Sequence, residues 1–134
     1  MKVIVIDGQG GNIGKQLVKT IKEDFPKVYV RAVGTNSIAT ANMLKGGADE
    51  AATGENAAIV AAGEADIIVG PIGIVIADAL LGEVSEKMAA AIGRSKAKKV
   101  LIPLNKCDIF VPGVSGSTSE IISDAIGLIR DIIS

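Results

Sequence analysis

Residues 3–15, with the sequence VIVIDGQGGNIGK, constrain the fold of this chain more than any other segment. Residues 3–6 are all β-branched and apolar, which is typical of a parallel strand that is buried on both faces. They are followed by a turn in which four of the seven residues 8–14 are glycine. From Asn12 onward, apolar residues recur at helical spacing and predict an amphipathic helix. A strand, a glycine turn and a helix in this order indicate the first unit of a nucleotide-binding α/β fold.

The glycine turn predicts a phosphate-binding site. The first turn of a helix presents unpaired N–H groups and the positive end of the helix dipole, and glycines let a phosphate approach them closely. Gly8, Gly11 and Gly14 fit the spacing G-x-x-G-x-x-G, whereas the dinucleotide pattern G-x-G-x-x-G would end one residue earlier. The alternative is a tight turn that needs glycine for its geometry alone. The residues of the turn that we expect to bind the ligand are Gly8, Gln9, Gly10, Gly11, Asn12, Ile13 and Gly14.

The same turn resembles a P-loop at Gly14 and Lys15, but the match fails elsewhere. The pattern G-x-x-x-x-G-K-[ST] requires glycine where this chain has Gln9, and Ser or Thr where it has Gln16. In a P-loop the hydroxyl at the second of these positions holds the magnesium ion of the nucleotide. We therefore do not expect ordinary ATP or GTP hydrolysis.

The residues after the second predicted strand bear on the choice between NAD and NADP. This strand covers residues 27–33, and an NAD site wants an acidic residue near the strand end to bind the ribose hydroxyls. No acidic residue lies between Asp24 and Asp49 in the sequence. Arg31 would suit the 2′-phosphate of NADP, or it faces solvent at a sheet edge. The pattern weakens NAD as the cofactor and leaves NADP or another phosphorylated ligand in place.

Two more strands are predicted at residues 66–70 and 100–104, with helical patterns between the strands. This alternation predicts an α/β fold: a single Rossmann-like, nucleotide-binding-type domain over residues 1–134, with three layers and a mostly parallel sheet. Counting these four strands in chain order, we expect the order 3-2-1-4 or a related arrangement. Residues 109–113 follow the last strand after a connection that is too short for a parallel crossover, so they predict an antiparallel edge strand.

Polar residues and glycines at the carboxyl ends of the predicted strands extend the candidate site, because these ends line one crevice in an open parallel sheet. Asp7 precedes the glycine turn and is a candidate catalytic base or metal ligand, or it caps backbone N–H groups such as that of Gly10. Cys107 is a second catalytic candidate beside Lys106, or an inert cysteine. The other residues that we expect to bind the ligand are Thr35, Asn36, Gly70, Pro71, Gly73 and Asn105.

Residues 74–81, from Ile74 to Leu81, predict an apolar helix in which Asp78 is the one charged residue. A helix at the protein surface would show a polar face. We therefore expect this helix to pack against its counterpart in a symmetric homodimer, which is the commonest way for a small chain to bury such a patch.

Composition excludes several classes of function. The net charge is −1 and aromatic residues make up 2% of the chain, so neither a basic surface nor stacking platforms for nucleic acid are expected. The sequence has no histidine and one cysteine, which excludes histidine-based nucleophile systems, an internal disulfide and an ordinary zinc site, and no metal is expected. No apolar segment is long and unbroken enough to span a membrane, and a cytoplasmic location is expected.

Five segments carry a resemblance to a known family: IDGQGGNIGK, GTNSIAT, GADEAATGENA, VGPIGIV and LIPLNKC. Over nearly its whole length the chain resembles the small bacterial proteins of domain of unknown function 3842, a family found mostly in anaerobic Firmicutes. The resemblance implies a Rossmann-like fold and a cytoplasmic context. It implies no established reaction and no assigned catalytic residues.

The leading functional hypothesis is a protein that binds a nucleotide or an NAD(P)-like phosphorylated ligand at the glycine turn. One alternative is a small NADP-dependent oxidoreductase with Asp7, Asn36, Asn105 and Cys107 around its substrate. Another is a non-catalytic regulatory or accessory subunit that acts through a protein partner. The sequence has no Tyr-x-x-x-Lys pair after the glycine turn, which favours binding without catalysis but leaves enzymatic activity an open question.

Overall fold

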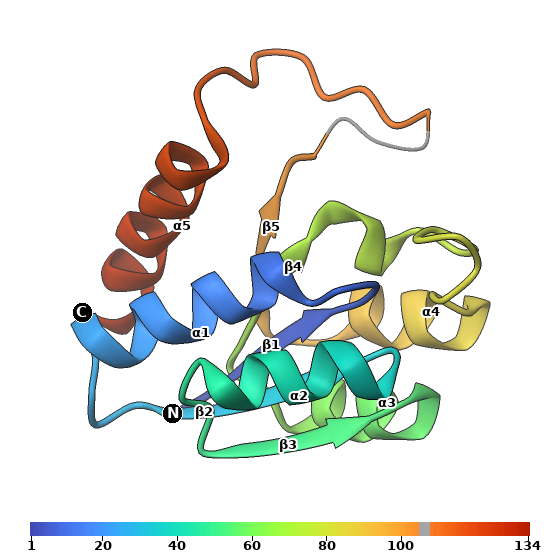
Figure 1. Cartoon of the computed structure of the whole chain (residues 1–134), viewed down its shortest axis with the longest axis horizontal. Coiled ribbons are helices and arrows are strands. Elements are labelled where there is room, and N and C mark those ends of the chain that lie inside the picture. Colours follow the sequence, from blue (N-terminus) through green and yellow to red (C-terminus); the bar gives the residue numbers. More distant parts are fainter. Residues whose placement is uncertain (105–107) are drawn as a thin grey trace.

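The computed structural model of the protein describes residues 1–104 and 108–134. Strands and helices alternate along the chain, as Figure 1 shows. The strands are β1 (Lys2–Asp7), β2 (Tyr29–Gly34), β3 (Glu50–Thr53), β4 (Ile67–Pro71) and β5 (Lys98–Ile102). The helices are α1 (Asn12–Asp24), α2 (Ser37–Lys45), α3 (Glu55–Glu64), α4 (Glu86–Arg94) and α5 (Thr118–Ile133), with a short 3₁₀ helix at Ile72–Val75.

The five strands form one parallel sheet in the order β3-β2-β1-β4-β5. β1 lies at the centre of the sheet, and Asp7 at its end is paired in register with Gly34 at the end of β2. Because the strands are parallel, their carboxyl ends share one edge of the sheet. The expected α/β fold with a parallel sheet is confirmed, and the turns that follow β1 and β2 lie next to each other.

Helices cover both faces of the sheet, which gives the fold three layers. Val3 and Val5 pack in one hydrophobic cluster with α1, α2 and α5, whereas Ile4 and Ile6 pack in a second cluster with α3 and α4. All four side chains are fully buried, because successive residues of a strand face opposite sides of the sheet. The central position of β1 therefore explains its unbroken run of β-branched residues.

The expected antiparallel edge strand at residues 109–113 is not formed. This segment lies in the connection between β5 and α5, without regular secondary structure. Ile109 packs with Leu80 and Leu104 around a small cavity instead of pairing with β5, and the Phe110 side chain is 80% exposed. The prediction was wrong because the connection leaves the sheet and leads to a helix, so it has no need to return along the sheet edge.

The expected strand order was also wrong, because β3 was not predicted. Its sequence, EAAT, contains two alanines, which have weak strand propensity. β3 pairs with β2 and occupies the edge next to it. The strand at residues 66–70, which we expected beside β2, is β4 and pairs with β1 through Val3 and Ile67.

The expected apolar helix at residues 74–81 is not formed either. The 3₁₀ helix ends at Val75, and residues 76–84 form a series of turns. Ile74 and Ala79 are buried in the second hydrophobic cluster, whereas Leu81 is 86% exposed. The apolar residues of this segment thus fill the protein's own core. The helical face on which we based the homodimer does not exist.

Candidate functional site

The Asp7 side chain accepts hydrogen bonds from both ends of the glycine turn. The side chain is 5% exposed, and its two oxygens accept hydrogen bonds from the backbone N–H groups of Gly8, at 2.8 Å, and Gly14, at 2.7 Å. A third bond, from Gly11 N–H to the Gly8 carbonyl at 2.9 Å, closes the turn. Asp7 therefore caps backbone N–H groups, one of the roles expected for it, although its donors are Gly8 and Gly14 and not Gly10.

Two glycines of the turn let α1 and α2 approach each other closely. Gly11 has φ 72°, and a Cβ there would lie 2.7 Å from the Cα of Ala39. A Cβ on Gly14 would lie 2.5 Å from the sulfur of Met43. The chain therefore needs glycine at these positions for packing, as the purely structural interpretation predicts.

Gly10 differs from the other glycines of the turn. Among the described residues, a Cβ at Gly10 would approach only the Asn12 side chain, at 3.6 Å, and the backbone does not have positive φ. Neither packing nor local conformation therefore requires glycine at this position. The absence of a side chain leaves the backbone of the turn open to a ligand.

The N-terminus of α1 opens into a cavity of about 110 Å³. Its N-cap residue, Gly11, provides no side-chain cap, and the N–H groups of Asn12 and Ile13 precede the first possible intrahelical bond. No acceptor for these two groups is found in the described part of the chain. The cavity is lined by Asp7, Gly8, Gln9, Gly10, Gly11, Asn12, Ile13, Pro71, Leu80 and Leu104.

Glu83, which the sequence patterns did not single out, reaches the turn from the loop before α4. Its Oε1 atom accepts three hydrogen bonds: from Gln9 N–H at 2.7 Å, from the Thr35 hydroxyl at 2.5 Å and from the Asn36 side-chain amide at 2.9 Å. No local motif links Glu83 to Gln9, which lies 74 residues earlier in the chain. The fold thus supplies a carboxylate at the end of β2, where the sequence showed none.

The pKa of the Glu83 carboxyl reflects this environment. Partial burial raises the pKa, but the hydrogen bonds from Gln9, Thr35 and Asn36 lower it by more, so that the net shift is downward. Hydrogen bonds to the charged form of a carboxyl favour ionisation. Glu83 is therefore an ionised acceptor at neutral pH.

The Asn36 side chain connects the segment after β2 to the glycine turn through hydrogen bonds. Its Oδ1 accepts from Ala39 N–H at 2.9 Å and caps α2, while its Nδ2 donates to the Gln9 carbonyl at 2.9 Å. Asn42, which lies within α2, donates from Nδ2 to the Gly10 carbonyl at 2.6 Å. The turn is held in place by the side chains of α2 as well as by Asp7.

The remaining candidate residues do not all lie at the cavity beside the glycine turn. Pro71 lines the same cavity as the glycine turn, and Gly73 lines a neighbouring cavity of about 30 Å³ that shares Leu80 with it. Gly70 is buried within the sheet, where a Cβ would lie 2.2 Å from the Ile6 carbonyl oxygen, so its backbone packs against β1. Asn105 and Cys107 lie outside the described residues.

Arg31, considered for the 2′-phosphate of NADP, is engaged away from the turn. Its Nη1 lies 2.9 Å from Glu64 Oε2, at the end of α3, and its Nε donates to the Tyr29 hydroxyl at 3.0 Å. Arg31 is also three residues before the end of β2. The alternative, a solvent-facing residue at a sheet edge, is not what the structure shows either, because β2 lies between β1 and β3 and the Arg31 side chain is 20% exposed.

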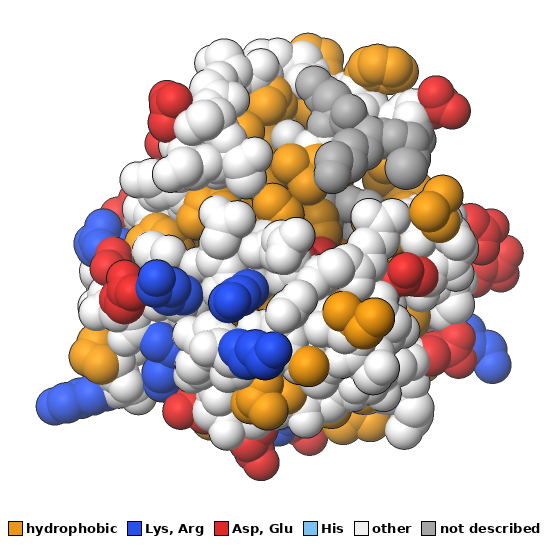
Figure 2. Space-filling view, in the orientation of Figure 1, with side chains coloured by type: hydrophobic (Ala, Val, Ile, Leu, Met, Phe, Trp, Pro, Cys, Tyr) orange, Lys and Arg blue, Asp and Glu red, His pale blue; other side chains and the backbone are white. Residues whose placement is uncertain are grey.

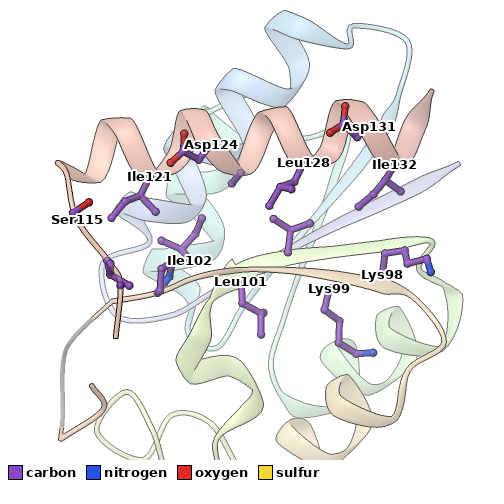
Figure 3. A pocket seen from close by; sticks show the side chains of 15 residues that line it. Lys98, Lys99, Leu101, Ile102, Ser115, Ile121, Asp124, Leu128, Asp131 and Ile132 are labelled. Carbon is purple, nitrogen blue, oxygen red and sulfur yellow. The ribbon is translucent and has the colours of Figure 1, made fainter. Parts of the chain in front are cut away.

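A larger, apolar groove of about 710 Å³ lies between β5 and α5. Figure 2 shows hydrophobic side chains in this part of the surface, and Figure 3 shows Leu128 and Ile132 pointing from α5 toward β5 while Asp124 and Asp131 point away. Among the described residues, the groove shows no set of hydrogen-bonded polar side chains comparable to that at the turn. We therefore place the candidate site at the glycine turn.

Residues 1–104 and 108–134 contain no cluster of three or more His, Cys, Asp or Glu side chains that could hold a metal ion. Within the same ranges, no helix has the length and apolar character that crossing a bilayer requires.

The parallel sheet, the covering helices and the glycine turn after β1 define a protein of the Rossmann-like class. The chain belongs to the family described as Domain of unknown function (DUF3842), whose model matches residues 2–134. This confirms the family resemblance noted in the sequence. No curated protein matches the chain.

A solved structure with a similar fold is the dodecameric FMN-dependent UbiX-like decarboxylase from Escherichia coli O157:H7. It superposes with a TM-score of 0.50 at 20% sequence identity, over 98% of this chain and 76% of that chain. At this level of identity the similarity supports the fold.

Proposed function

We propose that the protein binds a phosphorylated, nucleotide-type ligand at the glycine turn formed by residues 8–14. The observation that carries this proposal is the pair of N–H groups of Asn12 and Ile13, which face no acceptor in the described chain and lie at a cavity lined by the turn. Helix N-termini of this kind bind phosphate through the N–H groups and the helix dipole. Gly10 leaves the approach to them unobstructed.

The size and charge of the site favour a modestly charged phosphate group. The cavity of about 110 Å³ is smaller than the roughly 300–1,000 Å³ of typical ligand sites, so it would hold the phosphate while the rest of the ligand extends along the strand ends. No Lys or Arg is among the described residues that line it, and the carboxylates of Asp7 and Glu83 are close by.

Dinucleotides and flavin mononucleotide are the cofactors that we propose to test first. NAD and NADP are candidates because dinucleotide-binding folds have the same strand, glycine turn and helix at the start of the chain. FMN is a further candidate because the structural neighbour is described as FMN-dependent. The similarity to that neighbour supports the fold of the present chain and not its cofactor.

The groups around the turn favour binding over catalysis. Both oxygens of Asp7 accept from backbone N–H groups, and Glu83 Oε1 accepts from three donors. Carboxylates engaged in this way are poor general bases, because their hydrogen bonds stabilise the charged form. An NADP-dependent oxidoreductase is the alternative, and turnover of NADPH with a panel of carbonyl substrates would support it.

Self-association is also part of the proposal, although the helix first expected to mediate it is absent. The structural neighbour is described as dodecameric. Analytical ultracentrifugation over a dilution series would measure the oligomeric state of this chain, and a monomer at every concentration would contradict self-association.

Thermal shift against NAD, NADP, FMN, FAD, ATP, GTP and coenzyme A tests the proposed function. A ligand that binds the native state at a hundredfold excess over its dissociation constant stabilises it by about 2.7 kcal/mol. The informative variant is Gly10→Ala, which places a methyl group on the open backbone of the turn. The matched control is Gly63→Ala in α3, where a Cβ would approach no described atom within 4 Å.

We expect Gly10→Ala to fold normally and lose the stabilisation by ligand, and Gly63→Ala to retain it. The proposed function is contradicted if no compound raises the melting temperature, or if Gly10→Ala responds to the ligand as the wild type does.

A further inference from the structure

We propose that the Glu83 carboxylate binds the two neighbouring hydroxyls of a ribose, and that the site therefore accepts NAD and rejects its 2′-phosphorylated form. This inference rests on the proposed function and extends it by naming the group that recognises the sugar. It reverses the preference for NADP that the sequence indicated, because the carboxylate comes from a distant part of the chain and not from the end of β2.

Glu83 lies between the glycine turn and the end of β2. Its Oε1 atom is bound by Gln9 N–H, in the glycine turn, and by Thr35 and Asn36, directly after β2. In nucleotide-binding α/β folds the phosphate lies at the glycine turn and the ribose lies beside it at the end of the second strand. Glu83 therefore occupies the place from which an acidic residue contacts the ribose.

The two oxygens of the Glu83 carboxylate differ in their hydrogen bonding. All three hydrogen bonds go to Oε1, and Oε2 has no hydrogen-bond partner in the described part of the chain. An ionised carboxylate has about four acceptor positions and no donor. The three donors fix the orientation of Glu83, and Oε2 is left to accept from hydroxyl groups of a ligand.

The negative charge of Glu83 restricts which ligand groups can approach Oε2. A ligand group that approaches Oε2 must donate a hydrogen bond, and a hydroxyl pair does so, whereas a phosphate at the same position brings like charges together. The cation considered for the 2′-phosphate, Arg31, is paired with Glu64 at 2.9 Å. A 2′-phosphate would meet the Glu83 carboxylate without this compensating charge.

The loop that carries Glu83 is closed by hydrogen bonds between its own backbone groups. Asp78 N–H donates to the Val84 carbonyl at 2.7 Å, and Val84 N–H donates to the Ala79 carbonyl at 3.2 Å, which closes the loop on itself. Ala79 and Val84 are buried beneath it. Leu80 and Leu81 have φ 58° and 56°, a left-handed conformation that is unfavourable for leucine. Backbone strain of this kind persists where the surroundings enforce it, and it is commonly found at ligand clamps.

Isothermal titration calorimetry with NAD, NADP and 2′-deoxy-NAD (deoxygenated on the adenosine ribose) tests the inference. The proteins are the wild type, Glu83→Gln and the control Glu86→Gln, which removes an exposed carboxylate from the first turn of α4. We expect the wild type and the control to bind NAD about tenfold or more tightly than either analogue. Glu83→Gln should lose about tenfold in affinity for NAD and bind NADP nearly as well as NAD.

Three results would overturn the inference. Equal affinity of the wild type for NAD and NADP would refute the role of Glu83 and leave the proposed nucleotide binding intact. Tighter binding of NAD to Glu83→Gln would show that the carboxylate competes with the ligand for Gln9, Thr35 and Asn36. No binding of any of the three compounds to the wild type would refute the ribose assignment, and the thermal-shift panel with Gly10→Ala would decide separately whether another phosphorylated ligand binds. The wild-type comparison needs no variant, so it stands even if Glu83→Gln folds poorly.

Discussion

The Asp7 carboxylate accepts a hydrogen bond from the backbone N–H of Gly14 at 2.7 Å and so joins the end of β1 to the first turn of α1. The other oxygen of the same side chain accepts from Gly8 N–H at 2.8 Å. One buried residue thereby fixes both ends of the glycine turn. The shape of the candidate site depends on it.

Replacing Asp7 should destabilise the protein. Asp7→Ala leaves two buried N–H groups without this acceptor, and an unsatisfied buried group costs about 1–3 kcal/mol. We expect a loss of about 2–4 kcal/mol in the free energy of unfolding, measured by urea denaturation, and roughly half that for Asp7→Asn, which retains one acceptor oxygen. A loss below about 1 kcal/mol for Asp7→Ala would contradict the role of this side chain in holding the turn.

Gly11→Ala should destabilise the fold itself, so this variant cannot report on ligand binding alone. The new Cβ would lie 2.7 Å from the backbone of Ala39, and the residue would have to keep φ 72°. We expect a loss of about 2 kcal/mol or more in urea denaturation.

The control for this effect is Gly127→Ala in α5, where a Cβ would approach no described atom within 4 Å. It should gain about 0.5–1 kcal/mol from the better helix propensity of alanine. Equal stability of Gly11→Ala and the wild type would show that α1 and α2 are not in close contact at this point. Gly10→Ala is therefore the better test of ligand binding.

The pH dependence of stability should differ between the wild type and Glu83→Gln. The pKa of Glu83 in the folded protein is lowered from its ordinary value of 4.5, because the hydrogen bonds from Gln9, Thr35 and Asn36 outweigh the effect of burial. Its ionisation therefore stabilises the fold above about pH 4.5, and this contribution is lost as the pH falls through the lower folded-state pKa.

We expect the advantage of the wild type over Glu83→Gln, measured by urea denaturation, to be largest near neutral pH and to shrink below about pH 4.5. Other carboxylates with lowered pKa, such as Asp49 beside Lys22, titrate in both proteins and cancel in the comparison. An advantage that stays constant from pH 7 to pH 3 would contradict the pKa shift of Glu83.

Local patterns were enough to predict the parts of the fold that depend on local interactions. The β-branched run at residues 3–6 predicted the buried strand β1, and the helical spacing of apolar residues from Asn12 onward predicted α1. Each of these features depends on a few neighbouring residues. They are therefore visible in the sequence without knowledge of the tertiary structure.

Tertiary packing decided the features that the sequence did not predict. β3 contains Ala51 and Ala52, whose strand conformation comes from pairing with β2. The apolar residues 74–81 lacked a polar face because Ile74 and Ala79 enter the core, and not because a helix packs against a partner.

The candidate site was predicted in its local part and missed in its long-range part. Asp7 and the glycine turn are adjacent in the sequence, so their contact could be anticipated. Glu83 joins the turn through a hydrogen bond to Gln9 across 74 residues, and no spacing rule connects the two. The sequence shows no acidic residue near the end of β2 for the same reason. The fold brings Glu83 to this place from the loop before α4.

The central claim is that a phosphorylated ligand binds at the glycine turn, and amide chemical-shift mapping by NMR tests it most directly. Titrating the ¹⁵N-labelled protein with the phosphorylated compound that gives the largest thermal shift should shift the backbone signals of Gly10, Asn12 and Ile13, and leave those of Leu101 and Leu128 in the groove between β5 and α5 unchanged. The same titration of Gly10→Ala should produce no shifts at the turn. Shifts that cluster in the β5–α5 groove, or none at any concentration, would contradict the account.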